Sequence, residues 1–218
     1  SDYVVQENEQ QLYKFTTEFN PNERLQTEYN LLIKSASNFE NTDLVSSSNS
    51  RGASSLETEN IAILKSQEPT SINQELKAYY TLNEDHIFSF EAQHLSQDED
   101  PFYQAIKEIQ PFRNILPLDT NQSNFNINQK RNTSTDKVEG KLDYYYILSP
   151  KSNLNFTFGI TDVSQKFNSN IFQLLDDNSQ NKFEDQLLGN DVDFNFTDAY
   201  LSFRYRFITG IFTIDPGF

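Results

Sequence analysis

The chain has 218 residues and a formal net charge of −15, lacks cysteine, and is only 36% hydrophobic, although it contains 19 phenylalanines and 11 tyrosines. So acidic a chain is a poor match for a phosphate backbone, which argues against nucleic acid as a partner, and without cysteine there are no disulfides or thiolate metal sites. No run of about 18 apolar residues is present, which excludes a transmembrane helix but not a transmembrane barrel, whose strands alternate.

The first predicted elements are two strands within residues 13–33. From Tyr13 to Phe19 apolar and aromatic residues alternate with polar ones, and after the turn-forming stretch 20–23 the alternation continues. Side chains along a strand point alternately to opposite faces, so this hairpin has one apolar and one polar face.

A second hairpin is predicted over residues 72–92, with its turn at 83–85. His86 and His94 fall on its apolar side, eight residues apart, which is about 27 Å along a strand. Because this distance is too long for two ligands of one metal ion, we expect no shared metal. The two imidazoles would instead mark the two ends of a lipid-facing band.

Residues 98–118 are the least strand-like part of the chain, and we expect them to form a loop insertion with a short helix. Pro101 follows three acidic residues and suits the first position of a helix, which Pro111 would end. Phe102 and Ile106 are spaced as one helix face. The segment would be either an extracellular lid or a loop packed on the rim. Its candidate contacts with a ligand or partner are Phe102, Tyr103, Ile106 and Phe112.

Two further hairpins are predicted over residues 138–160 and 199–214, with turns at 149–152 and 208–210. Apolar residues take every second position in both. We expect the apolar faces to contact outer-membrane lipid and the polar faces to line a lumen in which opposite charges pair. The residues expected to face lipid are Tyr144, Tyr146, Phe156, Phe158, Phe203 and Tyr205. The residues expected to face the lumen are Glu75, Lys77, Glu91, Lys141, Asp143, Arg204 and Arg206.

The connections between the hairpins, at 38–70, 96–124 and 166–193, are long and polar, whereas the hairpin turns are short. Short turns at one end and long loops at the other are typical of outer-membrane barrels, while a soluble sandwich usually has loops of mixed length at both ends. The sequence therefore favours an all-β fold, an antiparallel transmembrane β-barrel segment of about eight strands, over a sandwich.

No catalytic or phosphate-binding pattern is present: the chain has no cysteine, no serine in a nucleophile-elbow context and no glycine-rich loop. We therefore expect a protein that is not an enzyme and needs no cofactor. The acidic clusters 98–100, 176–177 and 191–193 offer the hard oxygen ligands that calcium prefers, but they lack EF-hand spacing, so solvated loop tips are the favoured interpretation.

Three stretches carry a family resemblance: "DEDPFYQAIKEIQPFRNILPL", "EGKLDYYYILSPKSNLNFTFGITDVSQKFNSNIFQLLDD" and "DVDFNFTDAYLSFRYRFITGIFTIDPG". Over residues 98–218 the chain resembles the barrel region of TonB-dependent receptor-like outer-membrane proteins of the Bacteroidota. Residues 10–97 share only the repeated pattern of hairpins with that region. The resemblance implies a location in the bacterial outer membrane, a barrel of about 22 strands with a plug domain, and uptake of a ligand driven by an energising inner-membrane complex.

The chain departs from that family in having no plug and no segment for contacting the energising protein. We therefore expect residues 1–218 to form one region of a larger barrel, with segments 12–19 and 211–215 not paired to each other. Two alternatives stay open. One is a small structural or accessory barrel in an outer-membrane assembly, since eight strands can close; the other is a secreted glycan-binding β-sandwich.

Overall fold

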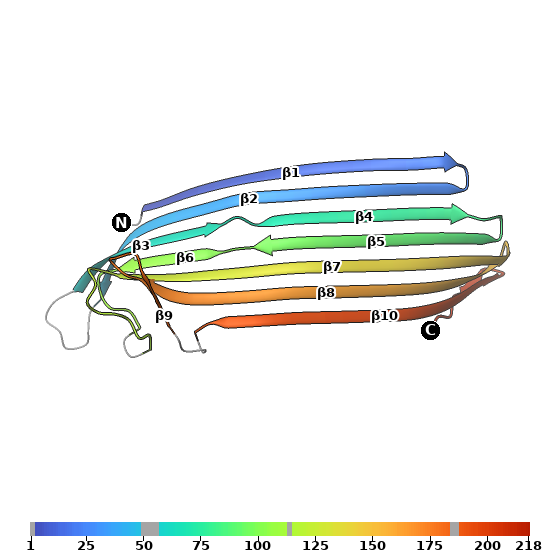
Figure 1. The fold of residues 1–218 in the computed structure, drawn as a ribbon. Coiled ribbons are helices and arrows are strands. Elements are labelled where there is room, and N and C mark those ends of the chain that lie inside the picture. Colours follow the sequence, from blue (N-terminus) through green and yellow to red (C-terminus); the bar gives the residue numbers. More distant parts are fainter. Residues whose placement is uncertain (1–2, 49–56, 113–114, 184–187) are drawn as a thin grey trace.

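The computed structural model describes residues 3–48, 57–112, 115–183 and 188–218. Within these residues the chain is all-β: every regular element is a strand, and all strand pairs are antiparallel. Figure 1 shows a single layer of long strands rather than two packed sheets. The all-β antiparallel fold that the alternation predicts is therefore confirmed, and the described residues contain no second layer of the kind that a sandwich needs.

The described residues form one sheet. Its strands are β1 (Tyr3–Asn22), β2 (Leu25–Ser48), β3 (Glu57–Gln67), β4 (Thr70–Thr81), β5 (His86–Glu99), β6 (Phe102–Lys107), β7 (Phe125–Ser149), β8 (Ser152–Leu174), β9 (Gln180–Lys182), β10 (Asn190–Thr209) and β11 (Phe212–Ile214).

Two pairs of these strands are continuous strands interrupted at a proline. β3 and β4 keep one register against β2, and β5 and β6 keep one register against β7. The interruptions fall at Pro69 and Pro101, which lack the N–H that a ladder needs. Their carbonyls still accept hydrogen bonds from the backbone N–H groups of Ala36 and Arg131, at 3.0 Å each. Counted as continuous strands, the described part of the sheet has the eight strands that the sequence predicts, with β9 as a short addition.

The prediction of a short helix within residues 98–118 is wrong. Phe102–Lys107 form β6, which pairs with β3 on one side and with β7 on the other. The spacing of Phe102 and Ile106 did not distinguish the two structures, because residues four apart also share a face of a strand. Hydrogen bonding on both sides outweighs the local preference of the segment, as tertiary context commonly does.

The expectation that residues 38–70, 96–124 and 166–193 form long loops also needs correction, because much of each segment is strand. β8 continues to Leu174 and β7 already begins at Phe125. β7 has 25 residues, which is about 85 Å at 3.4 Å per residue. A strand that only crosses a bilayer has about 9–11 residues, so the sheet extends far beyond a membrane thickness.

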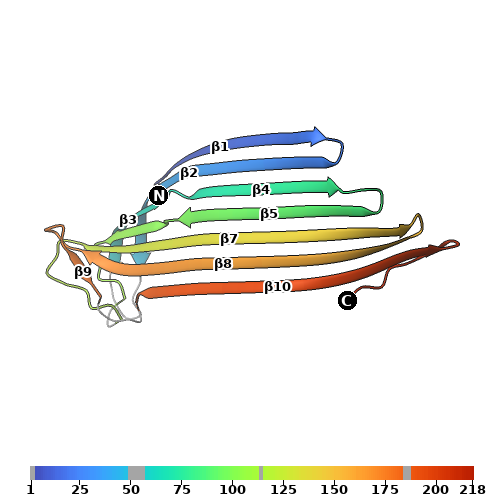
Figure 2. The same ribbon diagram turned by 45° about the vertical axis from the view of Figure 1, so that its right-hand side comes forward.

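The tight turns lie together at one end of the sheet, and the described parts of the connections that follow β6 and β8 lie at the other (Figures 1 and 2). The side-chain oxygens of Asn22 and Asn83 each accept hydrogen bonds from two backbone N–H groups that follow them, as asparagine does in turns. Gly210 has a φ of 59°, in the left-handed region that favours glycine. The predicted asymmetry of the two ends is therefore confirmed.

The two edges of the sheet are not joined to each other. Within the described residues β1 pairs only with β2, and the opposite edge is formed by β10 and β11. The C-terminal residues run beside β10: the N–H of Phe203 donates to the carbonyl of Phe218 at 3.1 Å, and that of Tyr205 to Pro216 at 3.0 Å. The prediction that segments 12–19 and 211–215 do not pair is confirmed, and in the part of the chain that the structure describes the outer edge of β1 has no partner strand.

Candidate functional site

One face of the sheet collects the apolar residues of all four hairpins. The register places Leu142, Phe158 and Leu201 directly opposite one another on β7, β8 and β10. Residues in register on neighbouring strands project to the same side. We call this side the apolar face. The residues predicted to face lipid all lie on it: Tyr144, Tyr146, Phe156, Phe158, Phe203 and Tyr205.

The apolar face has a limited height along the strands. On β7 it runs from Val138 to Leu148, and the next residue of the same face toward the loops is Asp136. On β8 it ends at Ile160, which is followed by Asp162. The β7 span agrees with the length of about 9–11 residues that a strand needs to cross a bilayer. Beyond this band most residues of the same face are polar.

No described part of the chain packs over the apolar face. Phe158 is 49% exposed and Leu201 is 75% exposed, whereas Ile127, at 8%, is the one buried hydrophobic residue among those described. Chains of this size that fold in water normally bury a hydrophobic core. Here the buried side chains are mainly polar, with Gln173 at 0% and Asp143 at 3%.

Aromatic rings form a stripe across the apolar face near the tight turns. The ring of His86 stacks on Tyr146 and Tyr144, with centroids 4.8 and 5.9 Å away, and its Nδ1 lies 2.7 Å from the Tyr144 hydroxyl. His94 lies at the other end of the band, where its Nε2 is 3.0 Å from Asp136 and its Nδ1 is 3.2 Å from the amide nitrogen of Gln74. The two histidines thus occupy the two ends of the band, the places predicted for them.

On the opposite side, the polar face, charges alternate from strand to strand. Glu28, Lys77, Glu91 and Lys141 stand directly opposite one another on β2, β4, β5 and β7. Opposite charges at facing positions of a sheet attract each other. The residues predicted to face a lumen all share this face: Glu75, Lys77, Glu91, Lys141, Asp143, Arg204 and Arg206.

Asp143 is the best-covered carboxylate of this face. Its partners are Lys141, whose Nζ lies 2.8 Å from Oδ2, and Thr157, whose hydroxyl donates to Oδ1. The amide of Asn155 donates to the same Oδ1 at 3.5 Å. Charge pairing and hydrogen bonds offset the cost of covering this carboxylate.

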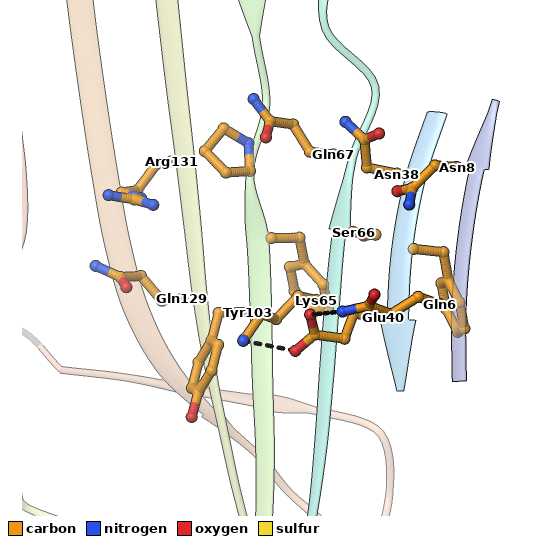
Figure 3. A pocket seen from close by; sticks show the side chains of 13 residues that line it. Gln6, Asn8, Asn38, Glu40, Lys65, Ser66, Gln67, Tyr103, Gln129 and Arg131 are labelled. Atoms are coloured by element: carbon orange, nitrogen blue, oxygen red, sulfur yellow. Dashed lines mark hydrogen bonds and ion pairs between the residues drawn. The ribbon is translucent and has the colours of Figure 1, made fainter. Parts of the chain in front are cut away.

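A hollow of about 480 Å³ lies on the polar face beyond the band, toward the loops (Figure 3). Its walls come from β1, β2, β3, β6 and β7, because these strands continue past the band in unbroken register. Side chains of the polar face line it: Gln6, Asn8, Asn38, Glu40, Lys65, Gln67, Tyr103, Gln129 and Arg131.

Glu40 and Lys65 organise the centre of the hollow. Lys65 Nζ donates to one carboxylate oxygen of Glu40 at 2.7 Å, and the amide of Gln6 donates to the other at 2.8 Å (Figure 3). The hydrogen bond from Lys65, together with that from Gln6, lowers the pKa of Glu40 below its ordinary value. The hydrogen bond to Glu40 in turn raises the pKa of Lys65. At neutral pH both groups are therefore charged and paired.

The structure separates the four residues predicted to contact a ligand or partner. Tyr103 lines the hollow with its side chain, and Phe102 borders it although its side chain belongs by register to the opposite face. Ile106 lines a different depression beside Leu44 and Ala62. Phe112 lies in the connection after β6, with a φ of 51° and a side chain that is 58% exposed. The amides that complete the hollow were missed because they lie far apart in sequence. The sequence held one local indication of these residues: the alternate positions that are polar in each hairpin stay polar in the long connections.

The acidic clusters do not all form loop tips. Asp98 and Glu99 belong to β5, and residues 191–193 belong to β10. Asp176 accepts hydrogen bonds from the backbone N–H and the hydroxyl of Ser123. In the described part of the chain, no three His, Asp or Glu side chains are grouped as a metal ion would require.

A scan against protein-family models finds no matching family, and a search of curated proteins finds no matching relative. The described residues include no helix with the length and hydropathy that crossing a membrane requires. The class that the structure itself defines is a single-layer, antiparallel β-sheet protein with one apolar and one polar face.

Proposed function

We propose that the chain forms a sector of the wall of an outer-membrane β-barrel of the TonB-dependent receptor-like class, which binds or takes up an extracellular ligand without catalysing a reaction. The observation that carries this proposal is the uncovered apolar face, a band about one bilayer high on a sheet whose described residues include only one buried hydrophobic side chain. Lipid would cover such a band without a second protein layer. In this arrangement the tight turns face the periplasm and the extended ends face outward.

The polar face supports the same proposal. Its alternating charges, from Glu28 to Lys141, suit a hydrated lumen better than a hydrophobic core. Among the described residues the outer edge of β1 has no partner. This edge, 20 residues long, would pair with a further barrel strand, since an unpaired edge exposes many backbone hydrogen-bonding groups.

Membrane fractionation tests this function. We expect the protein in the outer-membrane fraction, resistant to extraction with alkaline carbonate and released by detergent. Phe158→Asp and Leu201→Asp should lower the membrane-inserted amount, whereas Asn153→Asp, which faces Arg206, and Ser202→Asp, on the polar face of the same strands, should lower it less. Recovery of the unmodified protein in the soluble fraction would contradict the proposal.

The free edge of β1 also supports a second function, that of an accessory barrel component whose edge pairs with another protein of an outer-membrane assembly. The two functions differ in their need for energy. Ligand uptake through a TonB-dependent receptor-like barrel stops when the energising inner-membrane complex is removed, while an accessory component keeps its assembly role.

A further inference from the structure

The two prolines that interrupt the central strands lie at one level of the sheet. Pairing between β3 and β6 stops at Ser66 and Phe102, and pairing between β4 and β5 begins at Thr70 and Asp98, in the same register. The gap between these pairs spans about 13 Å along the strands. We propose that it is an expandable slit whose opening changes the width of the hollow. The inference deepens the proposed function and rests on it only for the side of the membrane that this end of the sheet faces.

One hydrogen bond closes the slit. The backbone N–H of Glu68 donates to the side-chain Oδ1 of Asp100 at 2.8 Å. In a regular antiparallel pair such an N–H would meet a backbone carbonyl of the neighbouring strand. Here the acceptor is an exposed side chain, which rotates away without any movement of the backbone. The bond between the two strands at this level is therefore easily opened.

The prolines also weaken the contacts on the two outer sides of the slit. Pro69 faces Ala36 of β2, Pro101 faces Arg131 of β7, and each proline carbonyl accepts one hydrogen bond at 3.0 Å. Because proline has no N–H, neither residue can return the second hydrogen bond of such a pair. Three neighbouring strand-to-strand contacts are thus weakened at one level, and local opening starts where such contacts are few.

Both ends of the slit are firmly held. Toward the tight turns β4 and β5 pair without interruption, and toward the loops β3 pairs with β6. Side chains reinforce the loop end: Glu108 accepts hydrogen bonds from the backbone N–H and the amide of Asn60 at 3.3 and 3.2 Å, and Glu59 accepts one from the N–H of Ile109 at 2.9 Å. A gap that is fixed at both ends widens only in its middle, as the two strands bow apart.

Recesses on the two faces of the sheet meet at the slit. Gln67 and Pro101 line the hollow on the polar face, and Glu68 lines a depression of about 270 Å³ on the other face, beside Ser35 and Ser37. The described chain forms a single layer here, so side chains and backbone at the slit have no second layer to support them. Movement of the two strands therefore changes the shape of the hollow directly.

The width of the slit can be measured across the hollow. Asn8, Asn38, Gln67 and Arg131 lie in one row across the sheet, with Asn8 and Arg131 at opposite margins of the hollow (Figure 3). Four strand spacings separate these two residues, which is about 19 Å between their backbones. Slit opening lengthens this distance, because the slit lies between them.

Spin labels at Asn8→Cys and Arg131→Cys, in a chain that has no natural cysteine, test the inference by pulsed EPR in lipid vesicles. We expect a broad distance distribution. Asp100→Ala should shift it to longer distances, because the closing hydrogen bond is lost. Pro69→Val combined with Pro101→Val should narrow it, because both backbone donors are restored and valine favours strands.

A matched pair of labels lies in an unbroken part of the same strands. Lys14 and Lys137 also share one row of the polar face, across β1, β2, β4, β5 and β7. Labels at Lys14→Cys and Lys137→Cys should give a narrow distribution that Asp100→Ala leaves unchanged. Distributions of equal width for the two pairs, or no response of the first pair to Asp100→Ala, would overturn the inference.

Hydrogen exchange of the unlabelled protein gives an independent measurement, with fragmentation to resolve single amides. Asp100→Ala should accelerate exchange of the Glu68 N–H about five- to tenfold, the effect of losing one hydrogen bond. Asp98→Ala, at an equally exposed position of the same face and strand, should not; equal rates in the two variants would contradict the slit. Because membrane insertion is measured separately, an inserted protein without slit opening contradicts this inference alone, and a soluble protein with slit opening contradicts the proposed function alone.

Discussion

The ring of Tyr200 on β10 lies directly over Gly159 on β8, so closely that a Cβ atom at position 159 would overlap it. Both residues belong to the polar face, beside Lys141 on β7. A glycine in a strand interior leaves a gap in side-chain packing, and an aromatic side chain from the neighbouring strand can fill that gap. Packing of the Tyr200 ring on Gly159 therefore stabilises the contact between β8 and β10, where the sheet would otherwise have a gap.

Substituting Gly159→Ala should displace the Tyr200 ring and lower the free energy of unfolding by about 1 kcal/mol, because the ring can swing aside but loses its packing. Urea unfolding of the protein in lipid vesicles measures this change. In the background of Tyr200→Ala the same substitution should cost nothing. Gly140→Ala is the control, since its Cβ would meet Ile160 at 3.4 Å without overlap; equal losses at both glycines would contradict the role of Tyr200.

Removing the positive charge beside Asp143 should destabilise the sheet. Lys141→Met leaves the covered carboxylate with hydrogen bonds alone, and we expect a loss of about 2 kcal/mol, less than for a fully buried pair because Lys141 is 40% exposed. Urea unfolding again provides the measurement.

The control for this substitution is Lys137→Met on the same strand. Lys137 and Glu139 are spaced like Lys141 and Asp143 and lie 2.9 Å apart, but both side chains are 36% exposed. The expected loss is below about 0.5 kcal/mol. Similar losses at positions 137 and 141 would show that coverage of Asp143 does not matter.

An arginine should be costly on the apolar face and tolerated on the polar face. Phe156→Arg places a charge near the middle of the band and should destabilise the protein in vesicles by about 2–4 kcal/mol. Asn155→Arg, one residue away, points to the polar face near Asp143 and should cost much less. Equal costs for the two variants would mean that lipid does not cover the apolar face.

Single cysteines test the orientation across the membrane. The natural chain has no cysteine, so Ser152→Cys at a tight turn and Ser179→Cys at the opposite end of β8 can each be labelled without background. We expect an impermeant maleimide added to intact cells to react at position 179 and to reach position 152 only after the outer membrane is opened. Labelling of both positions in intact cells would exclude the proposed topology.

Acid should break the ion pair between Glu40 and Lys65 only below the ordinary glutamate pKa of 4.5. The pKa of Glu40 is lowered by Lys65, so its carboxylate stays charged and paired at higher pH, and the pairing is lost as the pH falls through that lowered pKa. The carboxyl resonance of Glu40, followed by NMR in detergent micelles, should therefore stay constant from about pH 7 to about pH 5. The variant Lys65→Met should raise the midpoint of this titration, and an unchanged midpoint would show that Lys65 does not lower the pKa of Glu40.

The sequence by itself determined which residues share a face. Side-chain direction in a strand has a period of two residues. Tyr144, Phe156 and Phe203 therefore lie on one face in every antiparallel register that places the apolar positions of neighbouring strands opposite each other. The turn at Ser149–Ser152 was also predictable, because proline and serine specify turns through local chemistry. Where apolar residues mark one face, a sequence therefore identifies strands, turns and faces.

Only the tertiary structure decided the length of the strands, the strand character of Phe102–Lys107 and the lining of the hollow. Beyond the apolar band most residues of both faces are polar, so over much of these segments no alternation distinguishes a strand from a loop. The exception is the start of β10, where Val192, Phe194 and Phe196 alternate with polar residues. Those segments are strands because neighbouring backbones accept and donate their hydrogen bonds, as β3 and β7 do for β6. The hollow joins Gln6 to Arg131 through strands distant in sequence, and their pairing depends on the register of the whole sheet, which no local pattern contains.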